Sequence, residues 1–92
     1  MSHVPPPATR IGIAIGMLYR QALPPNPRPL AYVVIGLREV ARASGLTVEA
    51  IQAVARECPG AIERALPGFL ELSEDQEFRD SVVVRRRQEA RR

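Results

Sequence analysis

Proline and glycine divide this chain into short segments, and their positions limit what it can fold into. Four of the six residues from Pro24 to Pro29 are prolines. Proline lacks a backbone N–H and clashes with the preceding helical turn, so no helix continues through this stretch. Pro-Gly pairs at 59–60 and 67–68 interrupt the chain again. The 92 residues therefore predict one small domain built from short elements.

The segment from 8 to 23 carries two hydrophobic patterns. Its isoleucines and Met17 alternate with glycine and alanine in the manner of a strand, whereas Ile11, Ile15 and Leu18 also fit a helix. The unbroken length favours a helix, but the alternation leaves residues 10–18 open between helix and strand.

As a helix, this segment has a smooth face because Gly12 and Gly16 are four residues apart. Another helix of the same chain, or a partner protein, is expected to pack there. The candidate partner interface consists of Ile11, Gly12, Ile15, Gly16 and Tyr19.

The next segment has the clearest helical pattern in the sequence. Pro29 suits a first helical turn, and apolar residues follow at helical spacings. They are Leu30, Val33, Val34, Leu37, Val40 and Ala41. Ser44 and Gly45 are expected to end this helix, with glycine in a left-handed cap.

Beyond Gly45 the sequence predicts two short helices and a hairpin. Thr47 is a candidate N-cap for a helix reaching Cys58, and residues 61–66 allow one or two further turns. Residues 69–72 and 81–87 are predicted strands joined by a polar loop.

The expected fold class is therefore mainly α with a C-terminal β-hairpin, an α+β arrangement. Residues 1–7 are expected to form a disordered proline-rich tail, and residues 88–92 a basic tail. Between them lies a single domain, 8–87, in which an additional N-terminal helix precedes a core spanning 29–87.

The basic charge of this chain is carried by arginine alone. Thirteen arginines, ten acidic residues and no lysine give a net charge of +3. The guanidinium group suits phosphate and also stacks on bases, so arginine favours nucleic acid as a partner. A bias toward GC-rich codons is the alternative explanation, because alanine and proline are also frequent.

Several kinds of chemistry lack the residues they need. One cysteine excludes an internal disulfide, and one cysteine with one histidine offers no metal site. No nucleophile has a base beside it, and no phosphate-binding glycine loop is present. We therefore expect a protein that is not an enzyme and has no cofactor.

The apolar run Ile11–Tyr19 is too short to span a bilayer, so we expect a soluble, intracellular (cytoplasmic) protein without membrane contact.

The order of three helices followed by a hairpin resembles the winged helix-turn-helix family, in which the hairpin is the wing. It is closest to the LOTUS (OST-HTH) and La-motif type. The resemblance rests on a leucine-proline corner and the two strands after it, formed by Ala65, Leu66, Pro67, Phe69, Leu70, Leu72, Val82 and Val84. It covers residues 29–87 and implies nucleic-acid binding, with RNA favoured over DNA.

Two departures from that family bear on the mode of binding. The chain has few aromatic residues for stacking bases, and the helix at 59–66 offers only Glu63 and Arg64 for reading base edges. The expected contacts are therefore arginine to phosphate. The candidate nucleic-acid-binding residues are Arg64, Arg79, Arg85, Arg86, Arg87, Arg91 and Arg92.

Two other interpretations remain open. The C-terminal arginines also fit a solvated charge run, and the acids Glu74, Asp75, Glu77 and Asp80 would repel phosphate near the tip of the wing. The alternative function is a protein-interaction module, as a homodimer or as a small subunit of a larger assembly.

Overall fold

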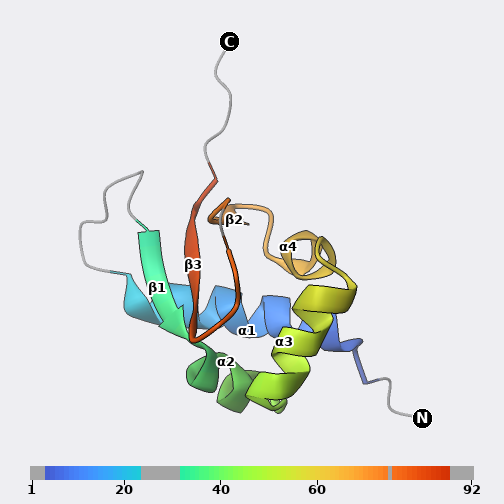
Figure 1. Cartoon of the computed structure of the whole chain (residues 1–92). Helices are drawn as coiled ribbons and strands as arrows, with labels where there is room; N and C mark the ends of the chain where they lie inside the picture. The colour runs from blue at the N-terminus through green and yellow to red at the C-terminus, as the bar shows by residue number, and fades with distance from the viewer. Residues whose placement is uncertain (1–3, 24–31, 75, 88–92) are drawn as a thin grey trace.

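The computed structural model of this protein describes residues 4–23, 32–74 and 76–87. These residues form helices and a small antiparallel sheet (Figure 1). In chain order the elements are α1 (Pro7–Ala22), β1 (Tyr32–Gly36), α2 (Leu37–Ser44), α3 (Val48–Glu57), α4 (Ala61–Ala65), β2 (Leu70–Leu72) and β3 (Ser81–Arg86). The α+β class is confirmed. None of the helices in these ranges is long and apolar enough to cross a membrane.

Residues 10–18, for which the sequence left helix and strand open, are helical and belong to α1. Ile11 and Ile15 are fully buried, whereas Ile13 and Met17 are exposed. Residues four apart lie on the same face of a helix, so the alternating apolar residues are divided between an inner and an outer face. The helix begins with Pro7, which needs no hydrogen-bond acceptor in the first turn.

The inner face of α1 packs against its own chain, which corrects two expectations. Ile11, Gly12, Ile15, Gly16 and Tyr19 are all buried, so they form no exposed partner interface. A Cβ on Gly12 would overlap the backbone of Ala65, and one on Gly16 would lie 2.7 Å from Cγ of Pro67. Helix α1 is thus part of the central core, packed on α2, α3, α4 and β1, rather than an addition to it.

Strand β1 corrects the helix predicted from Pro29. Residues 32–36 are extended, and only Leu37–Ser44 is helical. The Tyr-Val-Val-Ile sequence is rich in aromatic and β-branched residues, which pack well on a pleated sheet. Pairing of β1 with β3 decides the outcome, because it places Ile35 opposite Val82. Residues 24–31, including Leu30, lie outside the described ranges.

The sheet has the order β1-β3-β2, with both pairs antiparallel. One face packs onto the helices and forms the core with them; its buried residues are Ile35, Leu70, Leu72, Val82 and Val84. Figure 1 shows α1 crossing behind β1 and β3. The opposite face, on the side away from α1, carries Tyr32, Val34, Glu71, Val83 and Arg85 by strand alternation.

The turn chemistry expected between α2 and α3 is confirmed. Gly45 has a φ of 74°, the left-handed conformation of a helix C-cap. The hydroxyl of Thr47 accepts a hydrogen bond of 3.0 Å from the N–H of Ala50, which caps α3. The hairpin is confirmed as well, with strands β2 and β3 close to the predicted bounds.

Candidate nucleic-acid interface

Four arginines gather at the end of the sheet where β3 stops. Arg85 and Arg86 end β3, and Arg87 follows, with its N–H donating to the carbonyl of Phe69 at 2.7 Å. The guanidinium of Arg87 donates to the carbonyl of Leu70 at 3.3 Å. Arg20 joins this group from the last turn of α1, where its guanidinium carbon lies 5.4 Å from the ring centroid of Phe69.

A row of three side chains crosses the outer face of the sheet at the same end. Arg85 lies opposite Tyr32 on one neighbouring strand and opposite Glu71 on the other. Its guanidinium carbon is 5.3 Å from the centroid of the Tyr32 ring, and its Nη2 is 3.6 Å from Glu71 Oε2. The Nε of Arg85 is buried and has no hydrogen-bond acceptor among the described residues. Glu71 therefore compensates the charge of Arg85 through one long contact.

We call this region the sheet-end surface. It consists of Arg20, Tyr32, Phe69, Glu71, Arg85, Arg86 and Arg87. Its described residues include four arginines and one carboxylate, but the arginines do not share one face. Strand alternation places Arg86 on the face opposite Arg85, and Arg20 approaches from α1. A surface with this excess of positive charge attracts polyanions, and arginine can also contact phosphate with two parallel hydrogen bonds.

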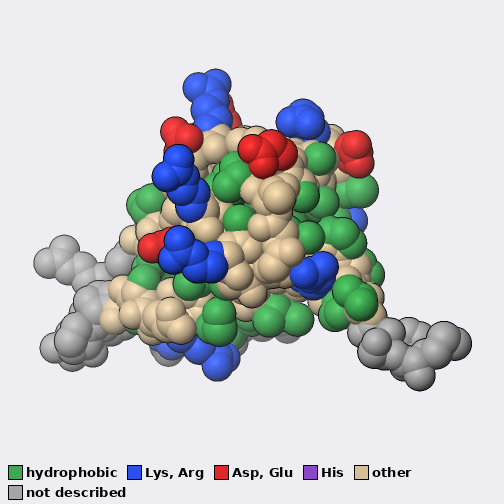
Figure 2. Space-filling view, turned by 90° about the horizontal axis from the view of Figure 1, so that it is seen from below, with side chains coloured by type: hydrophobic (Ala, Val, Ile, Leu, Met, Phe, Trp, Pro, Cys, Tyr) green, Lys and Arg blue, Asp and Glu red, His purple; other side chains and the backbone are tan. Residues whose placement is uncertain are grey.

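Helices α2 to α4 have no comparable excess, and the one arginine of α1 outside the sheet-end surface is Arg10. Helices α2, α3 and α4 carry as many arginines as glutamates: Arg38, Arg42, Arg56 and Arg64 against Glu39, Glu49, Glu57 and Glu63. On the face seen from below, basic and acidic side chains are interspersed (Figure 2). The positive charge of the described chain is thus concentrated at the sheet-end surface.

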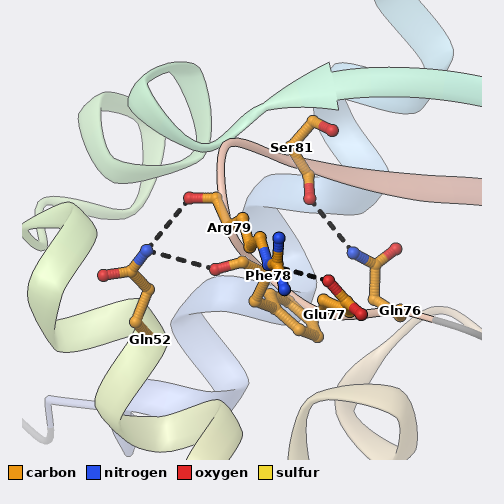
Figure 3. A network of polar contacts seen from close by, with 6 residues as sticks. All are labelled: Gln52, Gln76, Glu77, Phe78, Arg79 and Ser81. Carbon is orange, nitrogen blue, oxygen red and sulfur yellow. Dashed lines mark hydrogen bonds and ion pairs between the residues drawn. The ribbon is translucent and has the colours of Figure 1, made fainter.

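The loop between β2 and β3, which forms the tip of the hairpin, is held against α3 (Figure 3). The Nε2 of Gln52 donates to the carbonyls of Phe78 and Arg79 at 3.2 and 3.0 Å. The side chain of Gln76 connects the loop to the start of β3 by two hydrogen bonds. Its Nε2 donates to the carbonyl of Ser81, and its Oε1 accepts from the N–H of Val83. The loop therefore has a defined conformation over its described residues.

Phe78 is the apolar anchor of this loop. Its side chain belongs to the core, and its φ of 55° is the one positive value outside glycine in the described ranges. A left-handed aromatic residue is unfavourable by itself, so the burial and the hydrogen bonds from Gln52 must hold it there.

The charge of the loop does not favour phosphate. Arg79 forms an exposed ion pair of 2.8 Å with Glu77, and Glu74 and Asp80 lie nearby in sequence. A groove of about 430 Å³ between the loop, α3 and α4 is also lined by both signs of charge, with Arg56 and Arg79 beside Glu63, Glu74 and Glu77. Neither feature suits a polyanion.

The predicted binding residues are therefore separated in space. Arg85, Arg86 and Arg87 lie together, whereas Arg79 precedes β3 at its other end. Arg64 lies on α4, with its guanidinium beside Gly60 in the turn from α3. Arg91 and Arg92 lie outside the described ranges, and so does Asp75 of the loop.

Four members of the sheet-end surface were not predicted as site residues from the sequence: Arg20, Tyr32, Phe69 and Glu71. Arg20 and Tyr32 belong to segments far from Arg85 in the sequence, and no local pattern links them. Only the pairing of β1 with β3 and the packing of α1 bring them together.

No grouping of three or more metal-ligand side chains occurs within 4–23, 32–74 and 76–87.

Comparison with known proteins adds no identification: no family model matches the chain, and no curated protein or solved structure is significantly similar to it.

Proposed function

We propose that this protein is a non-catalytic winged-helix module that binds nucleic acid, RNA in preference to DNA, through arginine contacts to phosphates. The observation that carries the proposal is the sheet-end surface, which has four arginines and, among the described residues, one carboxylate, that of Glu71. Clustered arginines give affinity for the nucleic-acid backbone without reading its sequence.

The order of the elements supports the winged-helix part of the proposal. Helices α2, α3 and α4 are followed by the hairpin of β2 and β3, which would be the wing. The loop at its tip lies against α3 through Gln52, so in this proposal the strand ends, rather than the tip, contact the ligand.

The charged residues of α3 and α4 support the preference for RNA over duplex DNA. Reading the major groove requires several donors on an exposed helix face. Helix α4 has five residues, with Glu63 and Arg64 as its charged side chains, and the exposed charges of α3 are Glu49, Arg56 and Glu57. Acidic side chains on both helices disfavour the insertion of either helix into the major groove of duplex DNA.

The test is a titration of labelled single-stranded RNA, duplex RNA and duplex DNA at about 50 and 200 mM salt. The variant removes two charges, Arg86→Gln with Arg87→Gln. Its matched control is Arg38→Gln with Arg42→Gln, which removes the same charge from exposed positions on α2.

We expect binding that weakens steeply with salt. The slope of log K against log salt should fall by about 1.4 to 1.8 in the Arg86/Arg87 variant, because about 0.7 to 0.9 of the slope comes from each phosphate contact. The α2 control should bind nearly as the native protein does. Absence of binding at low salt, or an equal loss in both variants, would refute the proposed function.

One observation favours the alternative of a protein-interaction module. Ile13 and Met17 are exposed on the outer face of α1, and with Pro67 they line a mainly apolar hollow. Exposed apolar patches mark interaction sites in many proteins. If this hollow mediates a homodimer, light scattering should give twice the chain mass, and Met17→Glu should return the protein to the monomer.

A further inference from the structure

Tyr32 has an environment unlike that of the other tyrosine. Tyr19 is 3% exposed in the core, whereas Tyr32 is 47% exposed at the start of β1. Tyr32 faces outward on the sheet, as does Val34 two residues later on the same strand. A large ring on the outer face of a sheet is a surface on which a flat ligand can stack.

Arg85 and Glu71 hold that ring in place. The guanidinium of Arg85 lies over the ring at 5.3 Å, and Glu71 restrains Arg85 from the other side. Cation–π contacts are found about once per 70 to 80 residues. This chain places two of them, Arg85 with Tyr32 and Arg20 with Phe69, at the same end of the sheet.

The neighbouring charges complete the arrangement. Arg86 and Arg87 follow Arg85 directly and are exposed. Strand alternation places Arg87 on the same side as Arg85 and Tyr32, and Arg86 on the other, so Arg85 and Arg87 are the arginines available to phosphates beside a stacked base. An outward ring next to backbone-binding arginines is the combination that proteins use for unpaired strands, because every base offers a π face. In a duplex the bases are already stacked on one another and are not available to the ring.

We infer that Tyr32 is a base-stacking residue and that the ligand of the sheet-end surface is a single-stranded nucleic acid. This inference rests on the proposed function. It adds a ligand class, since phosphate contacts alone do not distinguish single strands from duplexes, and it adds a residue that contacts bases rather than phosphates.

The experiment compares two labelled single strands of equal phosphate charge. One is an oligouridine of about twelve nucleotides, within the usual site size, and the other is an abasic oligomer of the same length. Duplex RNA is the third ligand. Each is titrated against the native protein, Tyr32→Leu, which removes the ring, and Tyr32→Phe, which keeps it.

Tyrosine fluorescence gives a second readout that is independent of affinity. The chain has two tyrosines and no tryptophan, and Tyr19 is buried. Quenching on binding oligouridine therefore reports on Tyr32. We expect quenching in the native protein and none in Tyr32→Phe, although that variant should bind almost as tightly.

We expect Tyr32→Leu to bind oligouridine about 5- to 100-fold more weakly, with little change for the abasic oligomer or the duplex. The native protein should likewise prefer oligouridine to the abasic oligomer. If Tyr32→Leu or the abasic oligomer matches the native complex in affinity, stacking is wrong while the phosphate-binding function stands. If no ligand binds at low salt, the proposed function fails, and the stacking inference fails with it.

Discussion

The guanidinium of Arg85 lies over the ring of Tyr32, with 5.3 Å between the guanidinium carbon and the ring centroid. The two residues are direct neighbours on adjacent strands because β1 pairs with β3 in antiparallel register. This pairing places the start of β1 beside the end of β3. It therefore assembles the sheet-end surface from residues that no sequence motif connects.

Glu71 limits the positive charge of this surface, which leads to a gain-of-affinity prediction. Glu71→Gln removes the one carboxylate but keeps an oxygen that can accept a hydrogen bond from Arg85. We expect single-stranded RNA to bind about two- to five-fold more tightly at low salt, with a smaller gain at high salt. Anisotropy titrations measure it, and Glu39→Gln on α2 is the control of equal charge change. Weaker binding by the Glu71 variant would contradict the prediction.

Gly12 is predicted to be necessary for the packing of α1 on α4. Alanine at this position gains about 1 kcal/mol in helix propensity, but its Cβ would overlap the backbone of Ala65, which cannot rotate away. We expect Gly12→Ala to lower the free energy of unfolding by about 1 to 2 kcal/mol.

The control for Gly12 is Gly68→Ala, because a Cβ on Gly68 would meet no heavy atom within 4 Å. Its free energy of unfolding should change by less than about 0.5 kcal/mol. Urea denaturation of both variants measures the difference, and equal stabilities would show that α1 and α4 are less closely packed than the structure indicates.

Gln52 is predicted to order the loop between β2 and β3. Gln52→Ala removes both hydrogen bonds to the carbonyls of Phe78 and Arg79 and should cost about 1 kcal/mol of stability. Because Phe78 has an unfavourable φ, the loop should open more often. Hydrogen exchange should then rise at residues 76–80, while exchange in α1 stays as it is. A rise spread over the whole chain would argue against a local role.

Thr47 is predicted to stabilise α3 as its N-cap. Thr47→Ala leaves the N–H of Ala50 without its acceptor, and we expect a loss of about 1 kcal/mol. Thr47→Ser keeps a hydroxyl at the same place and should retain most of the stability. Thermal unfolding measures both variants, and the cap has no role if alanine and serine behave alike.

The sequence by itself determined the elements that depend on local chemistry. Gly45 ends α2 because it can adopt a left-handed conformation, and Thr47 begins α3 because its hydroxyl caps the helix. The hairpin was predicted from its β-branched residues and polar loop, and β3 has those residues. The two helix ends depend on neighbours within a few positions, whereas the hairpin pairs residues across its loop, such as Leu70 with Arg86.

Only the tertiary structure decided the rest. Residues 32–36 have apolar spacings that fit a helix, but pairing with β3 makes them a strand. Gly12 and Gly16 offered a face to any helix, and α4 with Pro67 occupies it. Arg20 and Tyr32 become neighbours of the β3 arginines through contacts between distant segments. Such contacts depend on the burial and pairing of the whole chain, which local propensity does not encode.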